Sequence, residues 1–164
     1  MCVCGKEWLK VVSKWYRVVS MLIGEYTHKI DTKKRLSLPV KFRKELGKKL
    51  VITRGLEGCL FVYSEKEWSK ISSGIAELGM GQAATRGFSR FMLAGAVEVS
   101  VDSLGRILIP EFLKDFAHLK SSVVFAGVHS RVEIWNDKQW QSYKDRIERE
   151  ADMLAENLGD IGAL

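Results

Sequence analysis

The residues best suited to chemistry form one short polar segment, residues 31–35, which read Asp-Thr-Lys-Lys-Arg. An apolar run ending in proline follows, and this order is typical of a tight turn that opens a β-strand. Lys33 and Lys34 are suited to phosphate oxygens, and the planar fork of Arg35 can donate to O6 and N7 of one guanine. Asp31 is expected to pair with Arg35 or to accept from backbone N–H groups, and so to hold the turn. The plainer alternative is a solvated hairpin tip.

The same pattern returns 71 positions further on, from Asp31 to Asp102. Residues 101–110 read Val-Asp-Ser-Leu-Gly-Arg-Ile-Leu-Ile-Pro, so that the turn arginine is Arg106. Farther along the chain, residues 60–68 match residues 132–140 at an offset of 72, so the second copy has one additional residue in between. Two matching blocks in the same order indicate an internal duplication.

Each copy predicts the same order of elements: a strand, the polar turn, a short strand ending in proline, a short helix, two strands and a longer helix. Gly47 is expected to end the first short helix, and Ser64 and Asn136 to cap the longer helices. Four short strands cannot bury two faces alone, so the copies are expected to close into one pseudo-symmetric β-barrel with peripheral α-helices, a mainly β fold. The expected strands are residues 25–30, 36–39, 50–54, 60–63, 97–101, 107–110, 122–126 and 131–135, and the short helices are residues 40–46 and 111–119.

Charge is unevenly divided along the chain. The formal net charge is +6, but residues 21–96 hold 14 cations and seven acids, whereas residues 97–164 hold eight cations and 12 acids. This asymmetry favours a polyanionic partner for the first copy. The cations expected to extend the basic surface are Lys41 and Arg43, together with Lys29, Lys44, Lys48, Lys49 and Arg54. The bland alternative is a basic protein without a specific partner.

Other classes of function find little support in the sequence. The cysteines Cys2, Cys4 and Cys59 are odd in number and lack a second ligand pair, so neither a disulfide framework nor a metal site is expected. No nucleophile, base or carboxylate pair forms a catalytic constellation, so we expect no enzyme, cofactor or small-molecule ligand. No apolar run approaches the roughly 20 residues that span a membrane. Two rivals remain: a protein-interaction scaffold anchored by tryptophans, and a nonspecific nucleic-acid binder.

Residues 21–26, both Asp-x-x-x-Arg turns with their prolines, and the pair Phe42-Arg43 together resemble the MraZ family, over Met21 to about Glu150. The resemblance implies a bacterial transcription factor built from two SpoVT–AbrB-type swapped-hairpin halves. It implies a ring-shaped homo-oligomer that binds short direct repeats in double-stranded promoter DNA, usually as a repressor of its own cell-division and cell-wall operon. The DNA-contacting arginine of the family corresponds to Arg35, with Arg106 as its second-copy equivalent. A cytoplasmic, nucleoid-associated protein is expected.

The chain departs from this family in two places. The family has glycine before the turn arginine, as at Gly105, but the first copy has Lys34, which would be mildly strained at a positive φ. Residues 1–20 precede the family-like start, and we expect either an initiator assigned too far upstream or a basic arm that adds nonspecific DNA affinity. The expected division is an extension (residues 1–20), a first half with a helical linker (21–96) and a second half with a C-terminal helix (97–164).

The second turn is expected to contribute less to DNA binding than the first. Its neighbours Ser103, Leu104 and Glu111 make a less basic setting than two lysines do. Arg106 is therefore expected to serve folding, held by Asp102, and to contact DNA more weakly.

Overall fold

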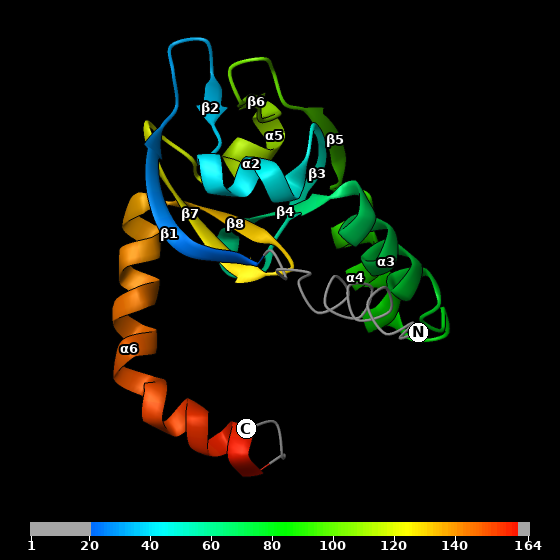
Figure 1. The fold of residues 1–164 in the computed structure, drawn as a ribbon. Helices are drawn as coiled ribbons and strands as arrows, with labels where there is room; N and C mark the ends of the chain where they lie inside the picture. Colours follow the sequence, from blue (N-terminus) through cyan, green and yellow to red (C-terminus); the bar gives the residue numbers. More distant parts are fainter. Residues whose placement is uncertain (1–20, 161–164) are drawn as a thin grey trace, which may run out of the picture.

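Residues 21–160 are described by the computed structural model, and the expected N-terminal extension, residues 1–20, lies outside the described residues. Figure 1 shows a strand-rich body with helices at its sides. No helix among the described residues is long and apolar enough to cross a membrane. The elements are β1 (Leu22–Lys29), β2 (Arg35–Ser37), α2 (Val40–Leu46), β3 (Lys49–Arg54), the single 3-10 turn η1 (Leu56–Gly58), β4 (Leu60–Ser64), α3 (Glu65–Ala76), α4 (Ala83–Leu93), β5 (Val97–Ser100), β6 (Arg106–Leu108), α5 (Glu111–Phe116), β7 (Ser122–His129), β8 (Val132–Asn136) and α6 (Asp137–Asp160).

The strands of the two copies are interleaved. Six of them form one antiparallel sheet in the order β1-β7-β8-β4-β3-β5. Three of its pairings join strands of different copies: β1 with β7, β4 with β8, and β3 with β5. A two-stranded ribbon, β2 with β6, also joins the copies. The ribbon contacts both ends of the sheet, since Ile30 after β1 bridges to Leu36 of β2 and β6 contacts β5.

A pseudo-two-fold axis relates the two copies. In the ribbon Leu36 lies opposite Ile107, its repeat equivalent, and in the sheet Phe61 lies opposite its equivalent, Glu133. Because the axis passes between the members of both pairs, the two Asp-x-x-x-Arg turns project from the same end of the molecule (Figure 1). The prediction of a mainly β, internally duplicated fold with peripheral helices is confirmed.

Alternation along the strands divides the apolar residues between two cores. Leu60 and Val62 of β4 belong to the main core, together with ribbon and short-helix residues such as Leu36 and Phe42, all without exposed surface. The intervening Phe61 and Tyr63 face a second, aromatic core. The main core thus fixes the ribbon and the short helices to the sheet, directly beneath the two turns.

The tryptophans proposed as anchors for a partner pack inside the protein instead. Trp68 of α3 packs against Tyr63, with ring centroids 5.8 Å apart, and Trp140 of α6 packs against Trp135 at 5.4 Å. The two pairs are equivalent in the repeat. Their side chains hold α3 and α6 on the aromatic core, so the duplication preserved a packing role.

Several elements differ from their predicted bounds. The helix over residues 40–46 was predicted correctly, but β1 begins three residues early and β7 continues to His129. These extensions pair with each other, and the Gly24–Gly127 pair lies within them. A Cβ on Gly127 would lie 2.7 Å from the Leu22 backbone, so only glycine permits this close approach. The second short helix ends at Phe116, before His118 adopts a φ of 49°.

Candidate nucleic-acid interface

The first turn is held by a single carboxylate. Oδ1 of Asp31 accepts from the backbone N–H groups of Lys33 and Arg35, both at 2.8 Å. Oδ2 accepts from Nε of Arg35 at 2.9 Å and lies 2.8 Å from a terminal guanidinium nitrogen of Arg35. The backbone N–H of Arg35, followed by its side chain, lowers the pKa of Asp31 below its ordinary value. Asp31 thus fulfils both expected contacts, because it caps the turn and orients the arginine.

The second turn has the same geometry. Oδ1 of Asp102 accepts from the backbone N–H groups of Leu104 and Arg106, both at 2.9 Å. Oδ2 accepts from Nε of Arg106 at 2.8 Å and lies 2.7 Å from a terminal guanidinium nitrogen. The pKa of Asp102 is lowered, first by the backbone N–H of Arg106. The expected pairing of Arg106 with Asp102 is present, but it does not distinguish the copies, because Arg35 is held in the same way.

What distinguishes the turns is the surface around them. The first turn exposes Lys33 and Lys34, and Lys41 is exposed on the neighbouring short helix. At the equivalents of Lys33 and Lys41 the second copy has Leu104 and Phe112, whose exposed fractions are 62% and 44%. At these two positions, exposed cations of the first copy are therefore replaced by exposed apolar side chains in the second.

Lys34 adopts the backbone conformation that glycine has in the second copy. Its φ is 61°, and the φ of Gly105 is 77°, so the lysine carries the strain expected from the sequence. Its Nζ lies 3.0 Å from Glu111 Oε2, which also accepts from Lys114 Nζ at 2.8 Å. Lys114, followed by Lys34, lowers the pKa of Glu111. Lys34 is therefore paired with an acid of the other copy rather than left free for phosphate.

Gly105 is favoured by its positive φ and also lies against a side chain of the first copy. A Cβ at this position would lie 2.2 Å from the Arg43 guanidinium carbon, so this guanidinium occupies the space that a side chain would need. Arg43 Nε donates to the Leu38 carbonyl at 2.8 Å, which fixes the side chain there. Arg43 of the first copy thus lies against the turn of the second.

We expect opposite effects from exchanging the residue types at these two positions. Lys34→Gly should raise the free energy of unfolding by up to about 1 kcal/mol, because relief of the positive φ exceeds both the added chain entropy and the loss of an exposed ion pair. Gly105→Ala should lower it by about 1–3 kcal/mol, since alanine is strained there and displaces Arg43. Urea unfolding followed by tryptophan fluorescence measures the free energy of unfolding of both variants. A lower value for Lys34→Gly than for the wild type would contradict backbone strain at Lys34.

The sequence-predicted residues are thus gathered at one end, although their partners were not foreseen. The duplication places both turns there, and α2 beside them carries Lys41 and Arg43. The roles of Glu111 and Lys114 were missed. Aligning the copies would have shown that Lys114 is the equivalent of Arg43. It would not have shown that Arg43 lies against Gly105 or that Glu111 pairs with Lys34 across the axis.

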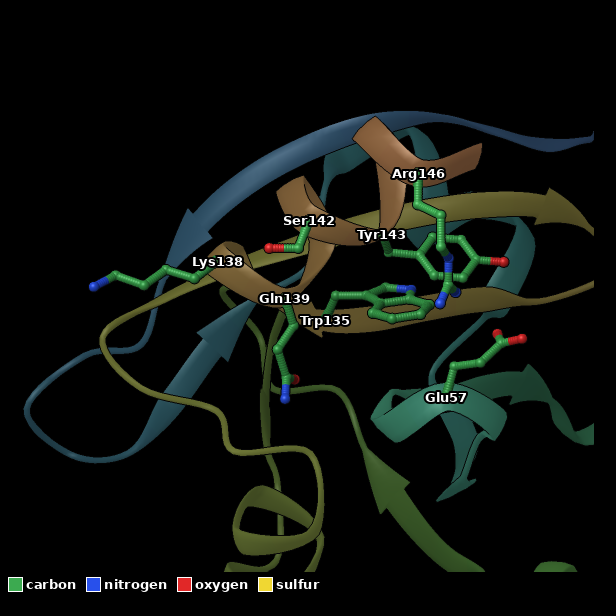
Figure 2. A pocket seen from close by; sticks show the side chains of 7 residues that line it. All are labelled: Glu57, Trp135, Lys138, Gln139, Ser142, Tyr143 and Arg146. Atoms are coloured by element: carbon green, nitrogen blue, oxygen red, sulfur yellow. The ribbon is translucent and has the colours of Figure 1, made fainter. Parts of the chain in front are cut away.

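A separate cleft lies where α6 leaves the sheet, away from the turns. It has a volume of about 500 Å³, and Figure 2 shows its lining by Glu57, Trp135, Lys138, Gln139, Ser142, Tyr143 and Arg146. Trp135 and Tyr143 form its aromatic floor, with ring centroids 4.9 Å apart. Cys59 is fully buried, and burial raises the pKa of its thiol. Residues 21–160 contain no group of three histidine, cysteine or carboxylate side chains placed to hold a metal ion.

Comparison with known proteins finds one family across the described residues. A family model whose description reads "MraZ protein, putative antitoxin-like" matches twice, over residues 21–91 and 92–158. Proteins named "Transcriptional regulator MraZ" from Thermoanaerobacter sp. (strain X514) and Caldanaerobacter subterraneus subsp. tengcongensis are 46% and 47% identical over 141 residues, covering 86% of this chain and 99% of each relative. One from Acetivibrio thermocellus is 43% identical over 142 residues, covering 87% and 99%. Each of the two family matches contains one Asp-x-x-x-Arg turn.

Proposed function

This chain belongs to the MraZ family of transcriptional regulators, and we propose that it acts by sequence-specific binding to double-stranded promoter DNA. In this proposal Arg35 reads base edges, Asp31 holds it, and Lys33, Lys41, Arg43 and Arg106 contact phosphates. Lys34 assists by tying the first turn to Glu111 of the other copy. The DNA consists of short direct repeats upstream of its own cell-division and cell-wall operon, which the protein represses. It works in the cytoplasm, in association with the nucleoid.

The observation that carries this proposal is the pair of aspartate-held arginines at one end of the molecule. Each arginine uses Nε and one terminal nitrogen on its aspartate, and the side chains of Arg35 and Arg106 remain 30% and 23% exposed. Because an aspartate already orients each arginine, the two side chains lose little conformational entropy when they meet a base or a phosphate. The basic surface of the first copy supplies the electrostatic attraction that DNA binding requires.

A single protomer is not enough for promoter specificity. One base-reading contact discriminates by about 1–3 kcal/mol, whereas specific sites are typically bound about 4–10 kcal/mol more tightly than nonspecific DNA. Several turns must therefore engage together, each on its own repeat, and a ring-shaped homo-oligomer would supply them. The halves proposed for this chain, residues 21–96 and 97–164, would then form one protomer of the ring.

The last helix offers a surface for such assembly. In Figure 1, α6 extends away from the body, and its distal half exposes Met153, Leu154 and Leu158. Leu154 and Leu158 are one turn apart and share a face. The acids around them, Glu150, Asp152 and Glu156, complement the cationic first copy of a neighbour. We assign this stripe to contact with a second copy of the chain.

Replacing Leu154 and Leu158 together by glutamate should shift the protein to smaller species in sedimentation velocity at micromolar concentration. The change puts two charges into an interface that is apolar, which is costly without partners. Glu148→Gln, on the same helix and exposed, is the matched control and should leave the distribution unchanged. An unchanged distribution for the double variant, or a monomeric wild type, would refute this assignment.

Footprinting on the DNA upstream of the gene tests the proposed function. Periodic protection over direct repeats, with affinity falling steeply as salt increases, is the expected result. Equal binding to scrambled DNA would indicate the nonspecific binder instead. Absence of protection at low salt would reject DNA binding and favour the interaction scaffold.

A further inference from the structure

A cleft of about 560 Å³ lies between the end of α2 and the second turn. Its walls come from both copies: Arg43, Gly47 and Lys48 from the first, and Val101, Asp102, Ser103 and Gly105 from the second. The geometry points to a phosphate subsite here, in which Arg43 and Lys48 bind one phosphate of the DNA backbone beside the second turn. This inference rests on the proposed DNA binding and extends it to a turn that has few cations of its own.

Arg43 is placed to donate into this cleft. Its Nε is used on the Leu38 carbonyl, and its guanidinium lies against Gly105, so the side chain is fixed at the turn. Among residues 21–160 its terminal nitrogens make no hydrogen bond or ion pair. A guanidinium that is positioned but only partly used suits bidentate contact with a phosphate.

Lys48 supplies the second cation. Its carbonyl accepts from the Val101 backbone N–H at 2.9 Å, which ties it to the base of the second turn. Its side chain is exposed, and within the described part of the chain its amine has no acidic partner. The one acid in the lining, Asp102, is already paired with Arg106. The cleft therefore keeps an excess of positive charge.

The first turn has a different neighbour at the equivalent position. The equivalent of Arg43 is Lys114, which is buried and paired with Glu111, and Glu111 also binds Lys34. The first turn carries its own exposed Lys33 instead. Under this assignment the first copy provides phosphate-binding cations for both turns.

Three glutamine variants test the subsite on the full chain: Lys48→Gln, Arg43→Gln and Lys66→Gln. Lys66 is an exposed cation beside Leu22, at the end of β1 opposite the turns, and serves as the matched control. Affinity for repeat-containing and scrambled DNA is measured over a salt series, with thermal unfolding as the check on folding. Lys48 is exposed, so its variant tests the subsite even if Arg43→Gln disturbs the turn.

Lys48→Gln should make the plot of log affinity against log salt shallower by about one unit per engaged protomer, equally on both DNAs. Lys66→Gln should leave the slope unchanged. Single DNA phosphates can be replaced by neutral methylphosphonates. At one position per repeat this replacement should lower the DNA affinity of the wild type but not that of Lys48→Gln.

The proposed function stands if the wild type binds the repeats and Arg35→Ala abolishes specificity. The subsite is nevertheless wrong if Lys48→Gln has the same salt slope as Lys66→Gln and every methylphosphonate that weakens binding of the wild type also weakens binding of Lys48→Gln. If wild type shows no salt-dependent DNA binding, both proposals fall together.

Discussion

Arg35→Ala is expected to abolish discrimination between repeat-containing and scrambled DNA, while weak, salt-sensitive binding to both remains. The alanine removes the only fork at the first turn that can donate to a guanine edge, at about 1–3 kcal/mol per contact. In the proposed assembly several protomers bind one promoter, so the loss at each protomer adds up to the whole difference of about 4–10 kcal/mol between specific and nonspecific binding. Gel shifts with both DNAs over a salt series measure it.

Two further variants sharpen this experiment. Arg35→Lys keeps the charge but not the fork, so it should retain nonspecific affinity without restoring discrimination. Arg106→Ala is the matched change at the second turn and should weaken specific binding less, because exposed Leu104 and Phe112 stand there in place of two lysines. A larger loss from Arg106→Ala than from Arg35→Ala would assign base reading to the second turn and overturn the proposed division.

Phe42→Ala is expected to lower the free energy of unfolding by about 3–5 kcal/mol, the usual cost of truncating a fully buried aromatic side chain. Phe42 has no exposed surface, belongs to the main core, and meets Tyr26 edge to face with ring centroids 5.1 Å apart. Its loss would leave a cavity under α2, the helix that carries Arg43. Chemical denaturation measures the change.

Val40→Ala is the control on the same helix. Val40 is 68% exposed, so its truncation should alter the free energy of unfolding by no more than about 0.5 kcal/mol. Similar small values for both variants would show that α2 is not anchored through Phe42. A variant of Phe42 that folds but binds DNA weakly would further link this core to the placement of Arg43.

The fold was largely predictable because its signals are local or repeated. The polar turns, the prolines after the short strands and the glycine after residues 40–46 each punctuate the chain near the observed boundary. The match between the sequences of the two copies indicated the duplication. The strand ends were less predictable, since the additional length of β1 and β7 depends on their pairing with each other, which involves residues more than 90 positions apart.

The candidate site was predictable only in part. Asp31 and Arg35 are four residues apart, so their contact follows from the turn itself. The contacts of Lys34 with Glu111 and of Arg43 with Gly105 cross between copies. These contacts exist because β2 and β6 pair across the axis, and no local sequence pattern predicts them. The sequence therefore predicts the strain at Lys34 but not its pairing with Glu111.

Covalent joining of the interleaved copies has a consequence for how such a protein can change. In a symmetric dimer of identical chains, every substitution appears twice, on both sides of the axis. Here the two sides are separate positions of one gene product, so each can be altered alone. The chain can therefore have Lys33 in one copy and Leu104 at the equivalent position of the other. In the same way it can have Arg43 in one copy and Lys114 in the other. One chain thereby gains freedom that a homodimer lacks: its two turns can specialise while the shared sheet and ribbon stay the same.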